Sequence, residues 1–191
     1  MSDKNIPVTS GAYHLANSKI LYEPQRSNNF EIHIPGLNNI TRVGADDQVI
    51  TDAPEILRLS VVNTSVPTFS QEPINVSYGN TTIKFAGKPQ YKNGQLTIND
   101  YIGADTKSIL MAWQNKSFNV KTQKVGMAKD YKKDAYLMEY TPDYQLVRTW
   151  TLYGCWIGDL DMGQFSMENN DKKQITATIY YDYAVMDIEE E

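Results

Sequence analysis

Short segments in which apolar and polar residues alternate dominate the sequence. Phe30, Ile32 and Ile34 alternate with Glu31 and His33, which is the period of two expected for a half-buried strand. Related patterns, several of them rich in β-branched and aromatic residues, predict further strands over 56–62, 95–101, 135–140, 146–157 and 174–183. The pattern therefore predicts a mainly β chain, with His33 on a strand face rather than in a catalytic site.

Two turn signals organise the middle of the chain. Residues 74–78 and 81–85 are β-rich runs around Gly79-Asn80, which is a strong signal for a β-hairpin. Asn93-Gly94 is a second turn signal and precedes the predicted strand over 95–101.

One segment is helical by its pattern. Residues 106–116 place Ile109, Leu110 and Trp113 on one face, and we expect the side chain of Asp105 to cap the first turn. This is the only helix that the pattern predicts clearly.

The domain organisation follows from these elements. Residues 1–27 carry scattered apolar positions without a sustained period and are predicted to be an N-terminal arm, whereas 28–191 form a single domain. That domain contains two predicted long loops, 36–55 and 117–134, and an end, 187–191, that is expected to fray. About seven or eight mostly antiparallel strands with one helix across a barrel or sandwich opening are the most economical fold.

Composition narrows the class of protein. The chain has 191 residues, of which 41% are hydrophobic and 21% charged, as in globular domains that fold around their own core. No apolar run approaches the length of a membrane-spanning helix, and residues 1–11 do not resemble a signal peptide, so we expect synthesis and retention in a cytoplasm. The net charge of −5 argues against a dedicated nucleic-acid binder.

The charge is distributed unevenly along the chain. Residues 71–141 hold ten lysines and six acidic residues, a local charge of +4, whereas 142–191 hold three basic and ten acidic residues, a local charge of −7. Such asymmetry is compatible with an ordinary solvated surface. It is also compatible with complementary patches through which identical subunits associate head to tail.

Candidate chemistry is sparse. The only histidines are His14 and His33, and the only cysteine, Cys155, lies in a strand-like run where a small buried side chain is expected. Asp159 and Asp161 have the alternate spacing of a calcium loop but lack its remaining ligands. We therefore predict no catalytic, cofactor-binding or metal-binding residues, and a protein that is not an enzyme.

An ordered series of motifs resembles one known family, the tail tube proteins of contractile-tailed (myovirus-type) bacteriophages. The resemblance covers about residues 29–184. Its motifs are Asn28–Ile34, Ser65–Pro67, Pro73–Val76, Ile83–Gly87, Ile109–Gln114, Asp130–Ala135, Leu152–Trp156 and Ile175–Tyr183.

The resemblance implies two packed antiparallel sheets, a sandwich or half-barrel with one flanking α-helix, as in the type VI secretion tube protein. It implies a structural virion protein whose copies close into hexameric rings that stack into the inner tail tube, the conduit for DNA delivery. The implied partners are further copies of the chain, the tail sheath protein, the baseplate hub, the tape measure protein and, transiently, genomic DNA in the lumen. The implied location is the phage tail, assembled in the host cytoplasm.

Combining the resemblance with the charge asymmetry gives a candidate ring-stacking interface. In it, Lys129, Lys132 and Lys133 meet acidic residues of the next ring. The acidic candidates are Asp159, Asp161 and Glu168. Two other functions stay open: a tube-like baseplate or tail-completion protein of the same fold, and a small β-sandwich hydrolase.

Overall fold

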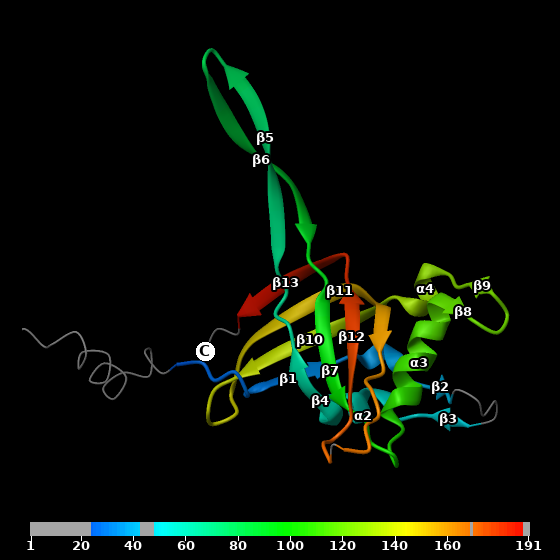
Figure 1. The fold of residues 1–191 in the computed structure, drawn as a ribbon. Helices are drawn as coiled ribbons and strands as arrows, with labels where there is room; N and C mark the ends of the chain where they lie inside the picture. The colour runs from blue at the N-terminus through cyan, green and yellow to red at the C-terminus, as the bar shows by residue number, and fades with distance from the viewer. Residues whose placement is uncertain (1–23, 43–47, 169, 189–191) are drawn as a thin grey trace, which may run out of the picture.

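The alternating segments form antiparallel strands in the computed structural model, which describes residues 24–42, 48–168 and 170–188 (Figure 1). One four-stranded sheet contains β1 (Phe30–His33), β10 (Lys133–Tyr140), the first part of β11 (Leu146–Asp161) and β13 (Tyr183–Ile188). The other contains the last part of β11, β12 (Gln174–Tyr180), β7 (Gly94–Asn99) and β4 (Val61–Thr64). The mainly β, antiparallel fold predicted from the sequence is confirmed.

Strand β11 belongs to both sheets, which are therefore two parts of one continuous seven-stranded sheet with the order β1-β10-β11-β12-β7-β4 and with β13 also paired to β11. Its residues up to Cys155 pair with β10, and those from Trp156 onward pair with β12. Just before this change of partner, Gly154 has a φ of +67°, and the register against β10 shifts by one residue. The backbone N–H of Gly154 donates a hydrogen bond of 3.0 Å to the Asp134 carboxylate. This bulge, which needs a glycine for its left-handed backbone, marks where the strand passes from one sheet to the other.

The hydrophobic core includes residues of both sheets, of helix α2 (Ala53–Ser60) and of helix α3 (Thr106–Ser117). The largest fully buried hydrophobic side chains are Trp113, Leu37, Ile40, Leu57, Leu96, Ile98, Ile109, Leu110, Ile157 and Ile175. Cys155 is fully buried among them, as expected. Burial raises the pKa of its thiol to about 12, which favours the protonated thiol over the thiolate.

Helix α3 confirms the helix predicted over 106–116, including its buried face. The capping prediction for Asp105 is wrong: this residue has a φ of 50°, and its side chain caps no backbone N–H. The carboxylate instead forms an ion pair with Arg42. The Asp105 carboxylate therefore binds the Arg42 guanidinium and not the backbone N–H groups at the start of α3.

The strand predicted over 56–62 is wrong for most of its length. Residues up to Ser60 form α2, and only Val61 and Val62 lie in a strand, β4. The buried positions of α2 include Ala53, Leu57 and Ser60, spaced at the helical intervals of four and three residues. The chain thus has a second helix on its core in addition to the single helix that the pattern predicted.

Both predicted long loops contain regular structure. Residues 36–55 include most of a 3₁₀ turn (Pro35–Leu37), β2 (Ile40–Thr41), β3 (Val49–Ile50) and the start of α2. Residues 117–134 include β8 (Phe118–Asn119), β9 (Lys124–Val125) and α4 (Ala128–Tyr131). The indole N–H of Trp113 donates to the Tyr131 carbonyl at 2.8 Å, which ties α4 to α3.

The predictions for the two ends of the chain are partly correct in the residues that the structure describes. Most of the predicted arm, 1–23, lies outside the described residues, and residues 24–27 contain no helix or strand. The strand predicted over 174–183 is interrupted at Tyr181-Asp182 and resumes as β13. The prediction that 187–191 fray is wrong for Asp187 and Ile188, because both pair with β11. Residues 189–191 lie outside the described residues.

Candidate assembly surfaces

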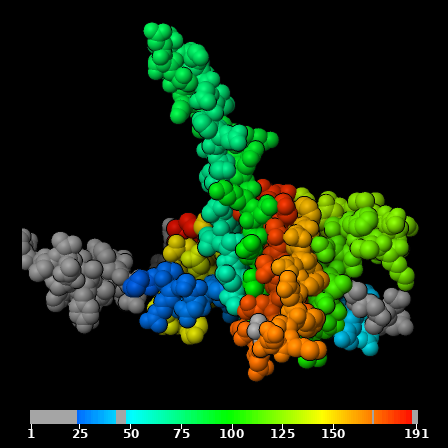
Figure 2. Space-filling model, in the orientation of Figure 1, coloured from blue at the N-terminus to red at the C-terminus, as the bar shows by residue number. Residues whose placement is uncertain are grey.

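A long hairpin projects from the body of the molecule. It consists of β5 (Phe69–Tyr78) and β6 (Thr81–Tyr91), and it extends well beyond both sheets (Figures 1 and 2). Its turn is Gly79-Asn80, with Gly79 at a φ of +59°, so the predicted hairpin is confirmed and is longer than its turn signal indicated. Every strand residue except Gly87 and Tyr91 is exposed.

The outer half of the hairpin is amphipathic. Cross-strand partners share a face, and here Ile74 opposes Phe85 and Val76 opposes Ile83. We define the apolar hairpin face as Ile74, Val76, Tyr78, Ile83 and Phe85, whose exposed fractions lie between 43% and 70%. The opposite face carries the polar pairs Asn75–Lys84 and Ser77–Thr82. Among the described residues, no core side chain lies beneath the apolar hairpin face, and an exposed apolar patch of this kind is typical of an interaction surface.

The root of the hairpin is held firmly on the body. The Tyr91 ring lies 5.5 Å from the Phe69 ring and 5.8 Å from the Tyr181 ring, centroid to centroid. The Lys92 N–H donates to the Thr68 carbonyl at 2.9 Å. Because β4 and β7 pair directly below this point, the hairpin continues the edge ribbon of the second sheet.

Strand β13 is a second surface available for assembly. It pairs with β11 along one side, and no other strand of the described residues pairs with its other side. Tyr183, Val185, Met186 and Ile188 are exposed along it. A free strand edge of this kind can template pairing with another chain.

The second sheet has a polar face turned away from the core. Asp159 opposes Thr178 and Asp161 opposes Thr176 across the β11–β12 pair, while Ala177 between them is buried in the core. The hydroxyl oxygens of Thr97 and Thr176 lie 3.3 Å apart on this polar face. Two of the acids predicted for ring stacking therefore lie on a sheet face.

The three predicted lysines lie around α4 and differ in their surroundings. Lys129 is exposed on α4. Lys132 contacts both carboxylate oxygens of Asp182 at 2.7 Å within the same chain. Lys133 begins β10, and its aliphatic chain passes directly over Gly36. Lys129 is thus the cation of the three most available to another molecule.

Glu168 lies exposed in the segment between β11 and β12. That segment and α4 lie at clearly separated ends of the molecule (Figure 1). The structure therefore does not bring the predicted acidic and basic groups together within one chain, and their pairing between chains stays a prediction.

Groups suited to catalysis or metal binding are few in the described part of the chain. It contains no cluster of three or more His, Cys, Asp or Glu side chains that could hold a metal ion. His33 lies half-buried on β1, as its pattern predicted, and His14 lies outside the described residues. In the same described ranges, no helix is long and apolar enough to cross a bilayer.

Comparisons by sequence find no relative, since no protein-family model and no curated protein sequence matches the chain. Comparison by structure finds several. A chain of the PVC sheath–tube complex, an extracellular contractile injection system in its extended state, superposes with a TM-score of 0.62 at 18% identity, covering 93% of this chain and 97% of that one.

Two further structures give similar values. The tube-terminating cap of the anti-feeding prophage has a TM-score of 0.61 at 15% identity, covering 87% of this chain and 92% of that one. The PVC sheath/tube terminator in the extended state has a TM-score of 0.59 at 20% identity, covering 86% and 96%. The fold is that of tube proteins of contractile injection systems, as the resemblance implied. These neighbours are structural proteins of such assemblies.

Proposed function

We propose that the chain is a tube subunit of a contractile tail, in which six copies close into a ring and rings stack into a hollow tube. The observation that carries the proposal is the apolar hairpin face, which projects from the body and has none of the described core residues beneath it. Removing about half of five large apolar side chains from water would contribute on the order of 5 kcal/mol per subunit. A second copy of the chain is the partner that a tube supplies at every step.

The geometry of this contact favours open stacking. On this proposal the apolar hairpin face is covered by a different part of the neighbouring copy, which makes the contact heterologous and lets it repeat without closing on itself. Ring closure, in turn, would pair the free edge of β13 with the edge of a neighbouring subunit, which removes an edge that otherwise promotes aggregation.

The polar face of the second sheet suits the wall of a conduit. Threonines and the carboxylates of Asp159 and Asp161 lie on it, and carboxylates repel phosphates, so they would let a duplex slide rather than bind. On this proposal the cargo is genomic DNA, and the location is the tail of a phage assembled in the host cytoplasm. The sheath surrounds the tube, and the baseplate hub and the tape measure protein are its other partners.

A second candidate has a specific observation in its favour. The terminating cap and the terminator superpose about as well as the chain from the sheath–tube complex, with TM-scores of 0.61 and 0.59 against 0.62. A tube-ending, baseplate or tail-completion protein of the same fold would form single capped rings. A tube subunit would form stacks.

The test uses two double variants at directly opposed hairpin positions. Ile74→Ser with Phe85→Ser removes apolar groups from the apolar hairpin face, whereas Asn75→Ser with Lys84→Ser changes the cross-strand pair on the other face. We expect the first variant to keep the thermal midpoint of the body and to lose long tubes in electron micrographs and fast-sedimenting species. The second should assemble like the wild type.

Two outcomes would overturn the tube proposal. One is a wild-type protein that stays a compact monomer at high concentration, with and without a baseplate template. The other is normal tube growth by the Ile74→Ser, Phe85→Ser variant. Single capped rings without stacks would select the second candidate.

A further inference from the structure

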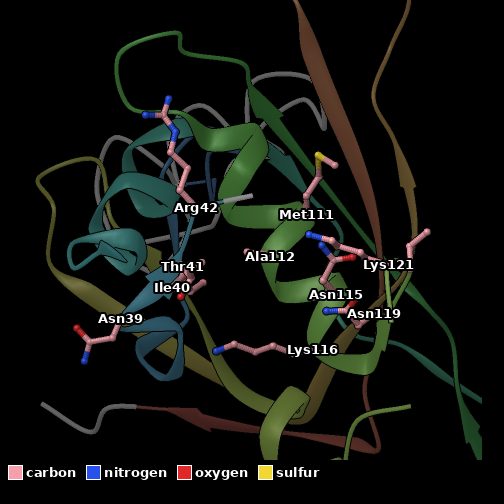
Figure 3. Close-up of a pocket in the computed structure, with 11 residues that line it drawn as sticks. Asn39, Ile40, Thr41, Arg42, Met111, Ala112, Asn115, Lys116, Asn119 and Lys121 are labelled. Carbon is pink, nitrogen blue, oxygen red and sulfur yellow. The ribbon is translucent and has the colours of Figure 1, made fainter. Parts of the chain in front are cut away.

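A groove of about 650 Å³ lies on the side of the molecule where α3 faces β2 and the turn after β8 (Figure 3). We call it the α3–β2 groove. Among the described residues, its lining includes Ile40, Arg42, Ala112, Lys116 and Lys121. None of the described lining residues is acidic, although the chain as a whole carries a net charge of −5.

The groove combines an apolar floor with a cationic rim. Ile40 and Ala112 are buried beneath it, while Lys116 extends from α3 toward the β2 segment in Figure 3. Burial and the nearby charge of Lys133 lower the pKa of Lys116, and the charge of Asp130 offsets only part of this effect.

The cations of the rim differ in how far they are already neutralised. Arg42 is committed to Asp105 by an ion pair and also donates to the Gln48 side chain at 3.0 Å. Within the described ranges, neither Lys116 nor Lys121 has an ion-pair partner. The groove is therefore matched to a short segment with carboxylates beside an apolar side chain.

We propose that the α3–β2 groove binds the acidic segment 187–191 of a neighbouring copy of the chain. This segment reads Asp-Ile-Glu-Glu-Glu, so it supplies four carboxylates for the lysines and one isoleucine for the floor. Ile188 is 66% exposed at the end of β13. The proposal deepens the proposed function by naming one contact between subunits of a ring.

The position of the segment excludes binding to the groove of the same chain. β13 ends on one side of the body, and α3, β2 and β8 lie on the opposite side (Figure 1). Residues 189–191 can reach only about 10 Å beyond Ile188 when fully extended. Two complementary surfaces on opposite sides of one subunit make a head-to-tail contact, which closes a ring when the rotation between subunits allows it.

The first measurement is direct binding, using the full chain at a concentration low enough to keep it unassembled. The probe is a fluorescein-labelled peptide, AVMDIEEE, corresponding to residues 184–191, and the control peptide is AVMNIQQQ. Fluorescence anisotropy at low salt should give a Kd on the order of 10–100 μM for the acidic peptide. The neutral peptide should bind at least about tenfold more weakly.

The second measurement locates the binding. Lys121→Glu changes an exposed side chain of the groove, and Lys124→Glu makes the same change at an exposed site on β9 outside it. We expect Lys121→Glu to weaken peptide binding and ring formation by about tenfold or more and Glu190→Lys to restore ring formation in the double variant. Lys124→Glu should leave both unchanged, and all variants should keep the wild-type thermal midpoint.

The outcomes separate this contact from the proposed function. Binding that is absent, or equally affected by Lys121→Glu and Lys124→Glu, overturns the contact even when tubes form. Peptide binding that Lys121→Glu abolishes, in a protein that never forms rings or tubes, supports the contact and overturns the tube. Restored ring formation in the Lys121→Glu, Glu190→Lys variant supports both the contact and the proposed function.

Discussion

Single residues decide how the two sheets are joined, and Gly154 is the clearest case. A Cβ at this position would overlap the carboxylate of Asp182, which Lys132 holds in place, and the φ of +67° is itself unfavourable for any other residue. The glycine is therefore required both by its backbone and by its neighbour.

We expect Gly154→Ala to lower the free energy of unfolding by about 1–3 kcal/mol, because both the left-handed backbone and the displaced ion pair are costly. Denaturation in guanidinium chloride measures this directly. The matched control is Gly103→Ala, where a Cβ meets no atom within 4 Å and φ is not positive. Its stability should stay within about 0.5 kcal/mol of the wild type. Equal stability of both variants would contradict our account of the bulge.

Predictions for single residues were correct where the neighbouring sequence determines a side chain's environment. They were wrong where a residue far away in the sequence determines it. Cys155 lies in a run of strand-forming residues, and its burial could be read from that context. Asp105 carries the right residue type for a helix cap, yet Arg42, 63 positions away, takes its carboxylate. No local pattern contains that competition.

At the scale of elements, the hairpin and α3 were visible in the sequence and α2 was not. A two-residue turn between β-rich runs has few alternatives. In contrast, α2 spans only eight residues. The apolar positions Ile56, Leu59 and Val61 match a strand pattern, but in the structure the Leu59 side chain is exposed. Pro54 in the first helical turn was the available signal, since proline is favoured there.

The hairpin has its own structural requirement at a bulge near its middle. The register shifts between Gln71 and Pro73, and a Cβ on Gly87 would overlap the Glu72 carbonyl oxygen. The bulge sets the direction in which the outer half of the hairpin, with its apolar face, leaves the root.

We therefore predict that Gly87→Ala impairs tube assembly while the thermal midpoint of the body shifts by less than about 2 °C, because the hairpin contributes nothing to the core. Differential scanning fluorimetry and electron microscopy measure the two effects. Lys88→Ala, at the exposed neighbouring position, should change neither. Tubes of normal length and number from Gly87→Ala would show that the bulge does not aim the hairpin.

At the scale of the whole molecule, the charge asymmetry still predicts attraction between rings, and the structure selects the residues that test it. Lys132 is occupied by Asp182 and Lys133 lies over Gly36, so their replacement would disturb the monomer. Lys129 on α4 and Glu168 in the segment between β11 and β12 are both exposed, and α4 and that segment lie at separated ends of the molecule in Figure 1. Replacing Lys129 or Glu168 therefore tests the contact between rings without disturbing an interaction within the monomer.

We expect Lys129→Glu to slow tube elongation, and Glu168→Lys in the same chain to restore it. An exposed ion pair contributes about 0.2–1 kcal/mol, and six copies in a ring would multiply this to about 1–6 kcal/mol per stacking step. Light scattering at increasing ionic strength should show wild-type elongation weakening in the same direction. Elongation of Lys129→Glu at the wild-type rate in low salt would exclude this charge from ring stacking.

Ring number and stacking could not be predicted from residue patterns, because they depend on which surfaces of one folded subunit complement those of another. Alternation along β13 and the hairpin identifies strands, but only the three-dimensional structure shows that their apolar side chains remain exposed. The family resemblance supplied the expectation of a tube, and the exposed surfaces supply its physical reason.

The continuity of β11 has a mechanical consequence. Its 16 residues span about 50 Å of extended backbone, so a pull applied to one sheet reaches the other through covalent bonds. The partner strands are antiparallel to β11 along its whole length, and a force along the strand therefore loads many hydrogen bonds in shear at once. A subunit built in this way resists tension along β11 far better than tension that peels β13 from its edge.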